Sequence, residues 1–432
     1  MRWLDQHIDL EKNKAVAGRV EGLKLDGMRA LCDVLGDPQA DQPTIHLTGT
    51  NGKGSVARMV TALLAAHDLA VGTYTSPHLE RINERISRNG EPIADDALAA
   101  LLTDLSAIES LLDRQPSYFE ILTAAAFRWF SDEAVAAAVV EVGLLGRWDS
   151  TNVVDGVVAV LTNVGHDHTD GKGDWRRRIA EEKSGIVKEG STFVLGETDP
   201  ALADVFDATP AALIWRRGVD FACVENRLAV GGRLLDLRTP GASYDEVFLS
   251  LHGAHQGENA AVAVAAAEAF FGRPLESALV AEALASVRNP GRFEVVQRDP
   301  LLILDGAHNR DGAIAAMEAL AEGFRVTGVT HLVMGVLDGR DPRELLDILD
   351  AEDAASVVCC TPESPRALPA AALAALVEAA GGRPVIVDDV ADAVQHALDR
   401  AAPDDIVLVT GSLYTVGDAR AACRRLGLVD GG

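Results

Sequence analysis

A glycine-rich turn with one lysine and one hydroxyl residue is the strongest chemical signal in the sequence. It occupies residues 47–55, where Lys53 lies between two glycines and Ser55 follows two positions later. Apolar residues precede the turn and a helix-forming run follows it, so the local pattern is strand, loop, helix. Glycines let backbone N–H groups approach an anion, while the positive end of the new helix and the Lys53 ammonium attract the same charge. The Ser55 hydroxyl suits a Mg²⁺ ion that bridges two phosphates.

The turn predicts a triphosphate-binding loop of the P-loop kind, although it departs from the common pattern G-x-x-x-x-G-K-[ST]. Leu47 takes the place of the first glycine, and Gly54 separates Lys53 from Ser55. The alternative is a strand-to-helix turn that is glycine-rich for backbone reasons alone. We favour phosphate binding because the lysine and the hydroxyl both stand in a strand–loop–helix context.

The succession of apolar runs predicts two α/β domains. A chain of 432 residues is longer than a single domain with one hydrophobic core usually is, so two domains are expected. Strands alternate with helices, and long apolar strands are typical of a parallel sheet covered on both faces. Residues 288–292 form the best linker, since they contain two consecutive turn-formers and a new strand follows them. We expect a P-loop-type parallel-sheet domain at 1–288, followed by a smaller Rossmann-like α/β domain at 289–432.

Composition narrows the class of partners. The net charge is −26, with 65 acidic against 39 basic residues, which argues against binding to nucleic acid or to an anionic membrane. The five cysteines are scattered and lack a C-x-x-C spacing, as expected of reduced thiols. The N-terminus lacks an apolar signal region, and no uncharged run is long enough to span a bilayer. We therefore expect a cytoplasmic protein.

Three polar residues follow predicted strands and form a candidate metal site. Ser76, Glu141 and His168 each lie at a strand end, and in open parallel sheets ligands collect beyond the carboxyl ends of strands. Hydroxyl, carboxylate and imidazole groups are acceptable Mg²⁺ ligands. The alternatives are a salt bridge between Glu141 and Arg147, and a packed or capping role for His168. Spacing alone leaves both interpretations open.

Four further positions have both a functional and an ordinary interpretation. Residues 305–309 and 411–414 follow strands and open helices, so they suit a small ligand, but each is also a plausible capping turn. Arg292 in the linker could reach a phosphate across an interdomain cleft, or be a surface arginine. Lys183 stands beside Glu181 and Glu182 on a predicted helix, and sequence physics alone favours a solvated helix face for it.

Taken together, these motifs resemble folylpolyglutamate synthase/dihydrofolate synthase, a branch of the Mur ligase superfamily. The resemblance covers nearly the whole chain. Its core is Thr-Asn-Gly-Lys-Gly at residues 50–54, which explains the extra residue between the lysine and the hydroxyl. The other matching segments keep the family's order along the chain: 75–79, 83–86, 141–143, 147, 149–152, 167–169, 182–186, 255–256, 259–260, 289–294, 305–309 and 410–412.

This resemblance implies an ATP-dependent amide ligase. ATP would phosphorylate a substrate carboxylate to an acyl phosphate, and the amino group of L-glutamate would displace phosphate. The acceptor would be dihydropteroate, the glutamate tail of a (tetrahydro)folate, or both. The implied cofactors are ATP and Mg²⁺, with two ions. The implied partners are small molecules only (pteroate or folate, L-glutamate and ATP), and we expect a monomer.

The resemblance also assigns roles to matching positions. The residues close to the chemistry are Lys53, Lys183, Asp305 and His308, and Lys183 matches a lysine that becomes N-carboxylated in this family. The ATP contacts are Gly49, Thr50, Asn51, Gly52, Lys53, Gly54, Ser55, Asn259, Arg292 and Asp305. The pterin-side residues are Ser117, Tyr118, Phe119, Glu120, Trp148, Asp149 and Ser150, while His308 and Ser412 lie toward the incoming glutamate. The metal ligands are Ser76, Glu141 and His168.

The chain departs from the family at two places. The family usually has Gly-Leu-Gly-Gly-Arg where residues 143–147 place Leu145 at the third position, which predicts crowding near the pterin. Residues 169–173 replace a Leu-Gly pair that commonly follows the histidine. Neither change touches a proposed metal ligand.

Two rival functions share parts of this pattern. Another Mur-type ligase, acting on a peptidoglycan precursor, would use the same phosphate loop and metal site. Residues 76–79 and 289–292 favour the folate branch. A catalytically inactive nucleotide-binding protein is the second rival. The presence of Lys53, Glu141, His168 and Lys183 argues against it.

Overall fold

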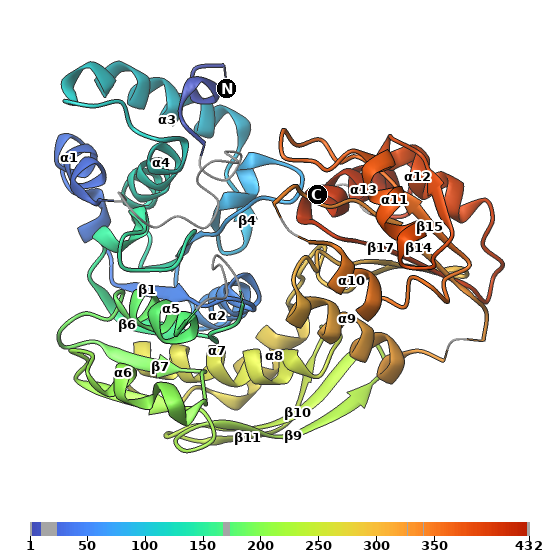
Figure 1. Cartoon of the computed structure of the whole chain (residues 1–432). Helices are drawn as coiled ribbons and strands as arrows, with labels where there is room; N and C mark the ends of the chain where they lie inside the picture. Colours follow the sequence, from blue (N-terminus) through green and yellow to red (C-terminus); the bar gives the residue numbers. More distant parts are fainter. Residues whose placement is uncertain (1, 10–23, 167–172, 326, 340, 430–432) are drawn as a thin grey trace. The chain divides into compact units, whose positions relative to one another are not determined.

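The computed structural model describes residues 2–9, 24–166, 173–325, 327–339 and 341–429 (Figure 1). The chain divides into two compact units. The first unit consists of Met1–His78, Ile82–Ser250 and His255–Arg288, and the second of Leu79–Arg81, Leu251–Ala254 and Asn289–Gly432. A search of the described helices finds none that combines the length and the apolar character needed to cross a bilayer.

The first unit is built on an eight-stranded sheet. Its strand order is β4-β3-β2-β5-β1-β6-β7-β8, parallel from β2 to β8, with β3 and β4 added antiparallel at one edge. The bounds of its strands are β1 Thr44–Thr48, β2 Val71–Tyr74, β3 Ile86–Arg88, β4 Glu91–Pro92, β5 Ala137–Glu141, β6 Gly156–Leu161, β7 Thr192–Leu195 and β8 Leu213–Arg216.

Helices bury the central strands on both faces. In β5, Ala138 and Val140 enter a core formed with α3 and α4, whereas the equally buried Val139 points to the opposite face, as alternation along a strand requires. Helix α2 also contacts β5, so helices cover β5 on both faces and every residue of this strand is buried. The helices of this unit are α1 Asp26–Val34, α2 Lys53–Ala66, α3 Asp95–Ile108, α4 Tyr118–Asp132, α5 Trp175–Ser184, α6 Ala203–Asp207, α7 His255–Phe271 and α8 Ser277–Ser286.

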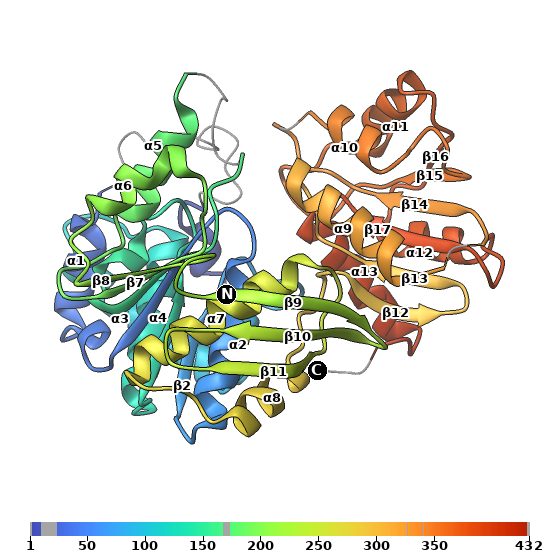
Figure 2. The same cartoon turned by 90° about the horizontal axis from the view of Figure 1, so that it is seen from below.

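A separate three-stranded antiparallel sheet completes the first unit. It contains β9 Ala222–Ala229, β10 Gly232–Arg238 and β11 Ser243–Leu249 in the order β11-β10-β9. Figure 2 shows this sheet beside α7 and α8, in agreement with the contacts of α7 with β9 and of α8 with β11. Helix α7 also touches α2, β6 and β7, so it lies between the two sheets.

The large sheet has a topological switch point between β1 and β6. The chain leaves β1 through α2 toward β2 on one side, and leaves β6 through α5 toward β7 on the other. The two connections therefore diverge from adjacent strands, and the loops that follow these strands can frame a ligand at the carboxyl ends. The glycine-rich loop at residues 49–52 is one of these two loops.

The second unit is a doubly wound six-stranded sheet. Its order is β12-β13-β17-β14-β15-β16, with every pair parallel except β12 and β13. Leu301 and Ile303 of β13 enter one core, and the alternate Leu302 and Leu304 enter another. The helices α9, α10 and α11 contribute to the first core, and α12 and α13 to the second. The bounds are β12 Glu294–Arg298, β13 Leu301–Leu304, α9 Arg310–Gly323, β14 Thr330–Met334, α10 Arg343–Ile348, β15 Ser356–Cys359, α11 Ala370–Ala379, β16 Pro384–Ile386, α12 Val390–Leu398, β17 Ile406–Thr410 and α13 Leu413–Arg425.

This topology confirms the predicted fold class, a P-loop-type parallel sheet followed by a smaller Rossmann-like α/β unit. It also shows one feature that the sequence did not suggest. The segment Leu79–Arg81 belongs to the second unit, where Glu80 forms ion pairs with Arg420 and Arg424 of α13. In the segment Leu251–Ala254, the ring of His252 packs against Phe293.

Candidate nucleotide and metal site

The glycine-rich loop joins β1 to α2, and two of its glycines are required by geometry. Gly49 has φ +152°, and a Cβ there would lie 1.8 Å from Oγ1 of Thr162. Gly52 caps α2 with φ +84°, and a Cβ there would lie 2.6 Å from Oδ1 of Asn259. Any side chain at these positions would combine backbone strain with a steric clash. The structure thus places Asn259 of α7 beside the phosphate loop, and its contact with ATP stays a prediction.

Two lysines converge on one carbonyl of this loop. Lys53 Nζ donates to the Gly49 carbonyl at 3.1 Å and to the Thr50 carbonyl at 3.3 Å. Lys183 Nζ donates to the same Gly49 carbonyl at 2.7 Å. Lys183 is only 3% exposed, so the solvated helix face favoured by sequence physics is wrong. Its helix α5 follows β6, and this connection carries Lys183 to the carboxyl end of the sheet.

Glu141 ends β5 beside the first turn of α2. Its Oε2 accepts a hydrogen bond from the Ser76 N–H at 3.3 Å and lies 3.7 Å from the position that a Cβ would take on Gly54. The Glu141 side chain is buried, and a buried carboxylate needs a partner or a cation. Ser76 and Glu141 therefore supply oxygen donors of the type that Mg²⁺ prefers, next to the phosphate loop.

The third predicted metal ligand, His168, lies outside the described residues, as do residues 169–172 of the altered loop. Among the residues that the structure describes, no group of three or more His, Cys, Asp or Glu side chains is arranged to hold a metal. Of the three predicted ligands the structure therefore describes Ser76 and Glu141, and their binding of a metal stays a prediction. The competing partner of Glu141, Arg147, donates to the Glu181 carbonyl and lies 4.0 Å from the Glu182 carboxylate.

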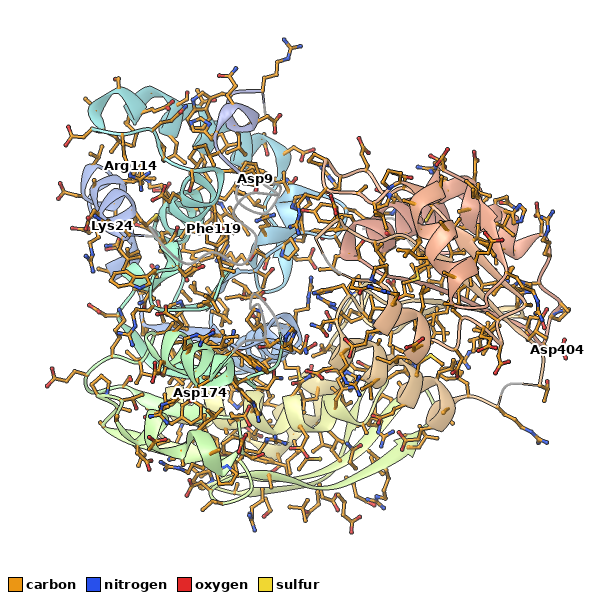
Figure 3. All side chains as sticks on the ribbon, viewed as in Figure 1. Asp9, Lys24, Arg114, Phe119, Asp174 and Asp404 are labelled. Carbon is orange, nitrogen blue, oxygen red and sulfur yellow. The ribbon has the colours of Figure 1, made fainter. Side chains whose placement is uncertain are left out.

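The predicted pterin-side residues occupy the start of α4 and the loop after β5. Ser117 and Glu120 form a capping box, in which Ser117 Oγ accepts from the Glu120 N–H at 3.2 Å and Glu120 Oε2 accepts from the Ser117 N–H at 2.8 Å. Glu120 also pairs with Arg114, which Figure 3 labels together with Phe119. Both Ser117 and Glu120 thus have evident structural partners, and their contact with a substrate stays a prediction.

Phe119 is the member of this group that lies against the loop after β5. A Cβ on Gly143 would lie 2.5 Å from the Phe119 ring, and the same ring is 5.9 Å from the ring of Tyr74. Tyr118 is buried beneath the guanidinium of Arg85, 5.7 Å from its ring centroid. Aromatic side chains therefore line this side of the loop.

The rest of the loop after β5 is held by Asp149. Its carboxylate accepts from the Leu144 N–H at 2.7 Å and from the Thr151 N–H at 3.0 Å. Burial raises the pKa of Asp149, and its hydrogen bonds lower it in part. Ser150 begins the short helix that Asp149 caps, and Trp148 is 42% exposed. Asp149 thus shapes the loop, and of the three predicted residues 148–150 the Trp148 side chain is the exposed one.

Leu145, where the family usually has glycine, adopts a left-handed backbone. Its φ is +58°, its side chain is buried in the core beside α5, and its carbonyl accepts a hydrogen bond from Thr48 Oγ1. A leucine pays in backbone strain for a conformation that glycine adopts readily. The chain keeps the glycine-like geometry and gains a buried apolar side chain.

In the second unit, Asp305 and Arg292 lie together. Asp305 accepts from the Phe293 N–H at 2.8 Å and from the Ala307 N–H at 2.9 Å. Burial raises the pKa of Asp305, while the positive charge of Arg292 and these two N–H groups lower it. Arg292 also donates to the Gly306 carbonyl at 3.4 Å.

The remaining predicted residues of the second unit lie at the starts of two helices. His308 Nδ1 is 2.8 Å from the Gly306 carbonyl, just before α9. Ser412 is buried and caps α13, with its Oγ accepting from the Thr415 N–H at 3.1 Å. The capping interpretation of residues 411–414 is therefore correct, and a role of Ser412 in binding glutamate stays a prediction. The loop 305–309 likewise ends in a cap, Asn309.

Sequence reasoning missed the loop that holds the phosphate loop in place. Thr162 and Asn163 directly follow β6, and both form hydrogen bonds with Asn51. The available signal was their place: polar residues at the end of a buried apolar strand, next to the switch point.

Comparison with known proteins identifies the family. Residues 47–267 match the Mur ligase middle domain, and residues 291–413 match the Mur ligase glutamate ligase domain. Dihydrofolate synthase/folylpolyglutamate synthase of Mycobacterium tuberculosis is 38% identical, over 92% of this chain and 89% of its own length. The chain belongs to the folylpolyglutamate synthase/dihydrofolate synthase family of Mur ligases.

Solved structures of this family agree with the fold over nearly its whole length. Folylpolyglutamate synthase of Mycobacterium tuberculosis, complexed with ADP and AMPPCP, gives a TM-score of 0.89 at 36% identity, covering 97% of this chain and 96% of that one. The bifunctional synthase of Yersinia pestis, complexed with AMPPNP and a Mn ion, gives 0.84 at 30% identity, covering 98% and 97%. The predicted family and the predicted class, an ATP-dependent folate–glutamate ligase, are confirmed.

Proposed function

We propose that this chain joins the amino group of L-glutamate to a carboxylate of dihydropteroate, of a folate glutamate tail, or of both, at the expense of ATP. The observation that carries the proposal is the convergence of Lys53 and Lys183 on the Gly49 carbonyl. The Glu141 carboxylate lies beside the first turn of α2, the helix that begins at Lys53. This arrangement puts positive charge and a helix N-terminus at one place, which suits a polyphosphate.

The chemistry requires activation of a poor electrophile. A carboxylate oxygen attacks the γ-phosphorus of ATP, the bond to the β-phosphate oxygen breaks, and ADP leaves with that electron pair. The amine nitrogen of glutamate, having lost a proton, then attacks the acyl carbon and expels phosphate. The N–H groups at the start of α2 and the Lys53 ammonium stabilise the charge that develops on the phosphate oxygens during the first step.

A divalent cation fits the donors at the loop. Ser76 and Glu141 would hold it through oxygen, and His168 is its predicted third ligand. Such an ion, when bound, neutralises charge on the phosphate oxygens. The Mn ion in the Yersinia pestis relative supports a divalent metal in this family, and we extend this to two Mg²⁺ ions in the present chain.

Lys183 is the proposed site of N-carboxylation. Reaction of its neutral amine with CO₂ forms a carbamate and releases one proton, which converts a cation into an anion. As an ammonium, Lys183 shares the Gly49 carbonyl with Lys53, so two like charges meet in a buried place. As a carbamate it would face the Lys53 charge with the opposite sign and offer oxygen to a metal.

The second unit is the proposed source of the remaining contacts. Arg292 and Asp305 would contact ATP, and His308 and Ser412 would lie toward glutamate. We further propose a cytoplasmic monomer without nucleic-acid or membrane partners, in keeping with its strongly acidic composition.

Phosphate release tests the proposal and decides the acceptor. The protein is incubated with ATP, Mg²⁺ and L-glutamate, and dihydropteroate or tetrahydrofolate is added separately. Release with both acceptors identifies a bifunctional enzyme, and release with one identifies which ligation it performs. If neither acceptor leads to phosphate release and the protein turns over a nucleotide-linked muramyl substrate, the proposal is overturned in favour of another Mur-type ligase.

A further inference from the structure

The backbone of Asn51 in the phosphate loop is held on both sides by one side chain. Asn163 Oδ1 accepts from the Asn51 N–H at 3.0 Å, and Asn163 Nδ2 donates to the Asn51 carbonyl at 3.0 Å. Only one orientation of the Asn163 amide satisfies both bonds, because oxygen must face the N–H and nitrogen the carbonyl. The side chain thus acts as a neighbouring strand would, pairing both polar groups of a single residue.

Three further bonds tie the same loop to the residues after β6. Thr162 Oγ1 donates to the Asn51 carbonyl at 2.7 Å. The Thr50 N–H donates to the Asn163 carbonyl at 3.1 Å, and Thr50 Oγ1 accepts from the Gly165 N–H at 2.9 Å. Every one of these bonds joins the loop after β1 to the loop after β6, the two loops of the switch point.

These contacts divide the phosphate loop into two parts. The N–H groups of Thr50 and Asn51 already donate to Asn163. The N–H groups of Gly52, Lys53 and Gly54 lie at the start of α2. The first N–H groups of an α-helix have no acceptor within the helix, because no helical turn precedes them. An anion would therefore be bound by the second part and not by the first.

We propose that Thr162 and Asn163 are positioning residues that hold the loop in its anion-binding conformation, and that Thr50 and Asn51 give no N–H to the phosphates. The ligand concerned is the polyphosphate of an adenine nucleotide, so this inference rests on the proposed function. It goes beyond that function because it assigns part of the nucleotide affinity to Thr162 and Asn163, two residues that do not contact the nucleotide.

The experiment is a titration of the full chain with ADP and, separately, with adenosine. Thr162→Val keeps the shape of the side chain and removes the hydroxyl, while Thr162→Ser restores the hydroxyl. We expect Thr162→Val to raise the Kd of ADP about five- to tenfold, as for one lost hydrogen bond, and Thr162→Ser to recover most of this loss. Asn163→Ala removes two bonds and should raise the Kd of ADP about 30-fold or more.

Binding of adenosine shows whether a variant has lost only the conformation of the phosphate loop or the stability of the whole nucleotide site. Since adenosine has no phosphates, its Kd should stay within about twofold in these variants. In steady-state assays the KM for ATP should rise, while the KM for L-glutamate stays near its wild-type value. Equal losses for ADP and adenosine, or no loss for ADP, would overturn the inference. If Asn163→Ala does not fold, the comparison of Thr162→Val with Thr162→Ser carries the test alone.

Failure of the proposed function would look different. Wild-type protein that does not bind ADP, or a Lys53→Ala variant that binds it normally, would refute the phosphate loop itself. Normal wild-type binding that is lost in Lys53→Ala but kept in Thr162→Val and Asn163→Ala would refute only the positioning role.

Discussion

Replacing Glu80 by glutamine should destabilise the second unit much more than removal of an exposed ion pair in the same unit. The Glu80 carboxylate is 6% exposed and accepts from Arg420 at 2.5 Å and from Arg424 at 2.7 and 2.8 Å. Glutamine keeps the shape of the side chain and removes its charge. Breaking a buried pair from one side typically costs about 3–5 kcal/mol, because the remaining charge stays buried.

Two features reduce this figure here. Arg424 is 33% exposed, and Arg420 keeps a second partner in Glu294 at 3.0 Å. We therefore expect Glu80→Gln to lower the free energy of unfolding by about 2–3 kcal/mol. For a unit of this size, that corresponds to a fall in Tm of about 4–12 °C.

A matched control is available on the surface of the same unit. Glu344 pairs with Arg310 at 2.8 Å, but both side chains are 56% exposed. Glu344→Gln should change stability by less than about 1 kcal/mol. Calorimetric unfolding of wild type and both variants gives the comparison. Equal Tm values for Glu80→Gln and Glu344→Gln would refute the argument that burial makes the Glu80 cluster strong.

Four further predictions concern the site and its supports. Lys53→Ala should reduce phosphate release about 100-fold or more, since it removes the positive charge that stabilises the phosphate oxygens during transfer; near-normal release would remove the loop from the mechanism. Glu141→Gln should shift the Mg²⁺ concentration needed for half-maximal activity upward, and an unchanged Mg²⁺ profile would exclude Glu141 as a ligand. Leu145→Gly should relieve about 1–2 kcal/mol of strain but lose about 2–5 kcal/mol of packing, so a denaturant titration should show net destabilisation; a more stable variant would contradict this balance. Burial lowers the pKa of His46 to about 3, so the folded state resists protonation and stability should fall as pH drops below 6.5. Between pH 7 and pH 5 this loss should reach about 2 kcal/mol, and His46→Gln should flatten the pH profile by that amount if the assignment holds.

The local pattern at residues 47–55 was enough to predict the strand, the loop and the helix. The spacing of apolar residues distinguishes a strand from a helix, and glycine often occupies positions where a side chain does not fit. The same logic predicted two α/β units, because uninterrupted apolar strands alternating with helices are typical of a parallel sheet whose two faces are covered by helices. These features depend on neighbours in the sequence, and the structure confirms them.

Lys183 shows where local reasoning stops. Its neighbours Glu181 and Glu182 suggested a solvated helix face, yet its ammonium is buried and bonded to a loop 134 residues away in sequence. The orientation of α5 against the sheet decides this, and periodicity in a short charged helix does not report it. Only the resemblance to a family had singled out this lysine.

By itself, the sequence determined the kinds of element, their order and the chemistry of the phosphate loop, because these follow from short-range sterics and hydrophobic spacing. Only the tertiary structure decided which residues support that loop. Thr162 and Asn163 meet Asn51 because β1 and β6 are neighbours in the sheet although more than 100 residues separate them in the chain. Glu80 joins the second unit for the same kind of reason. Pairing across such separations is set by strand order and packing of the whole unit, and no local pattern encodes it.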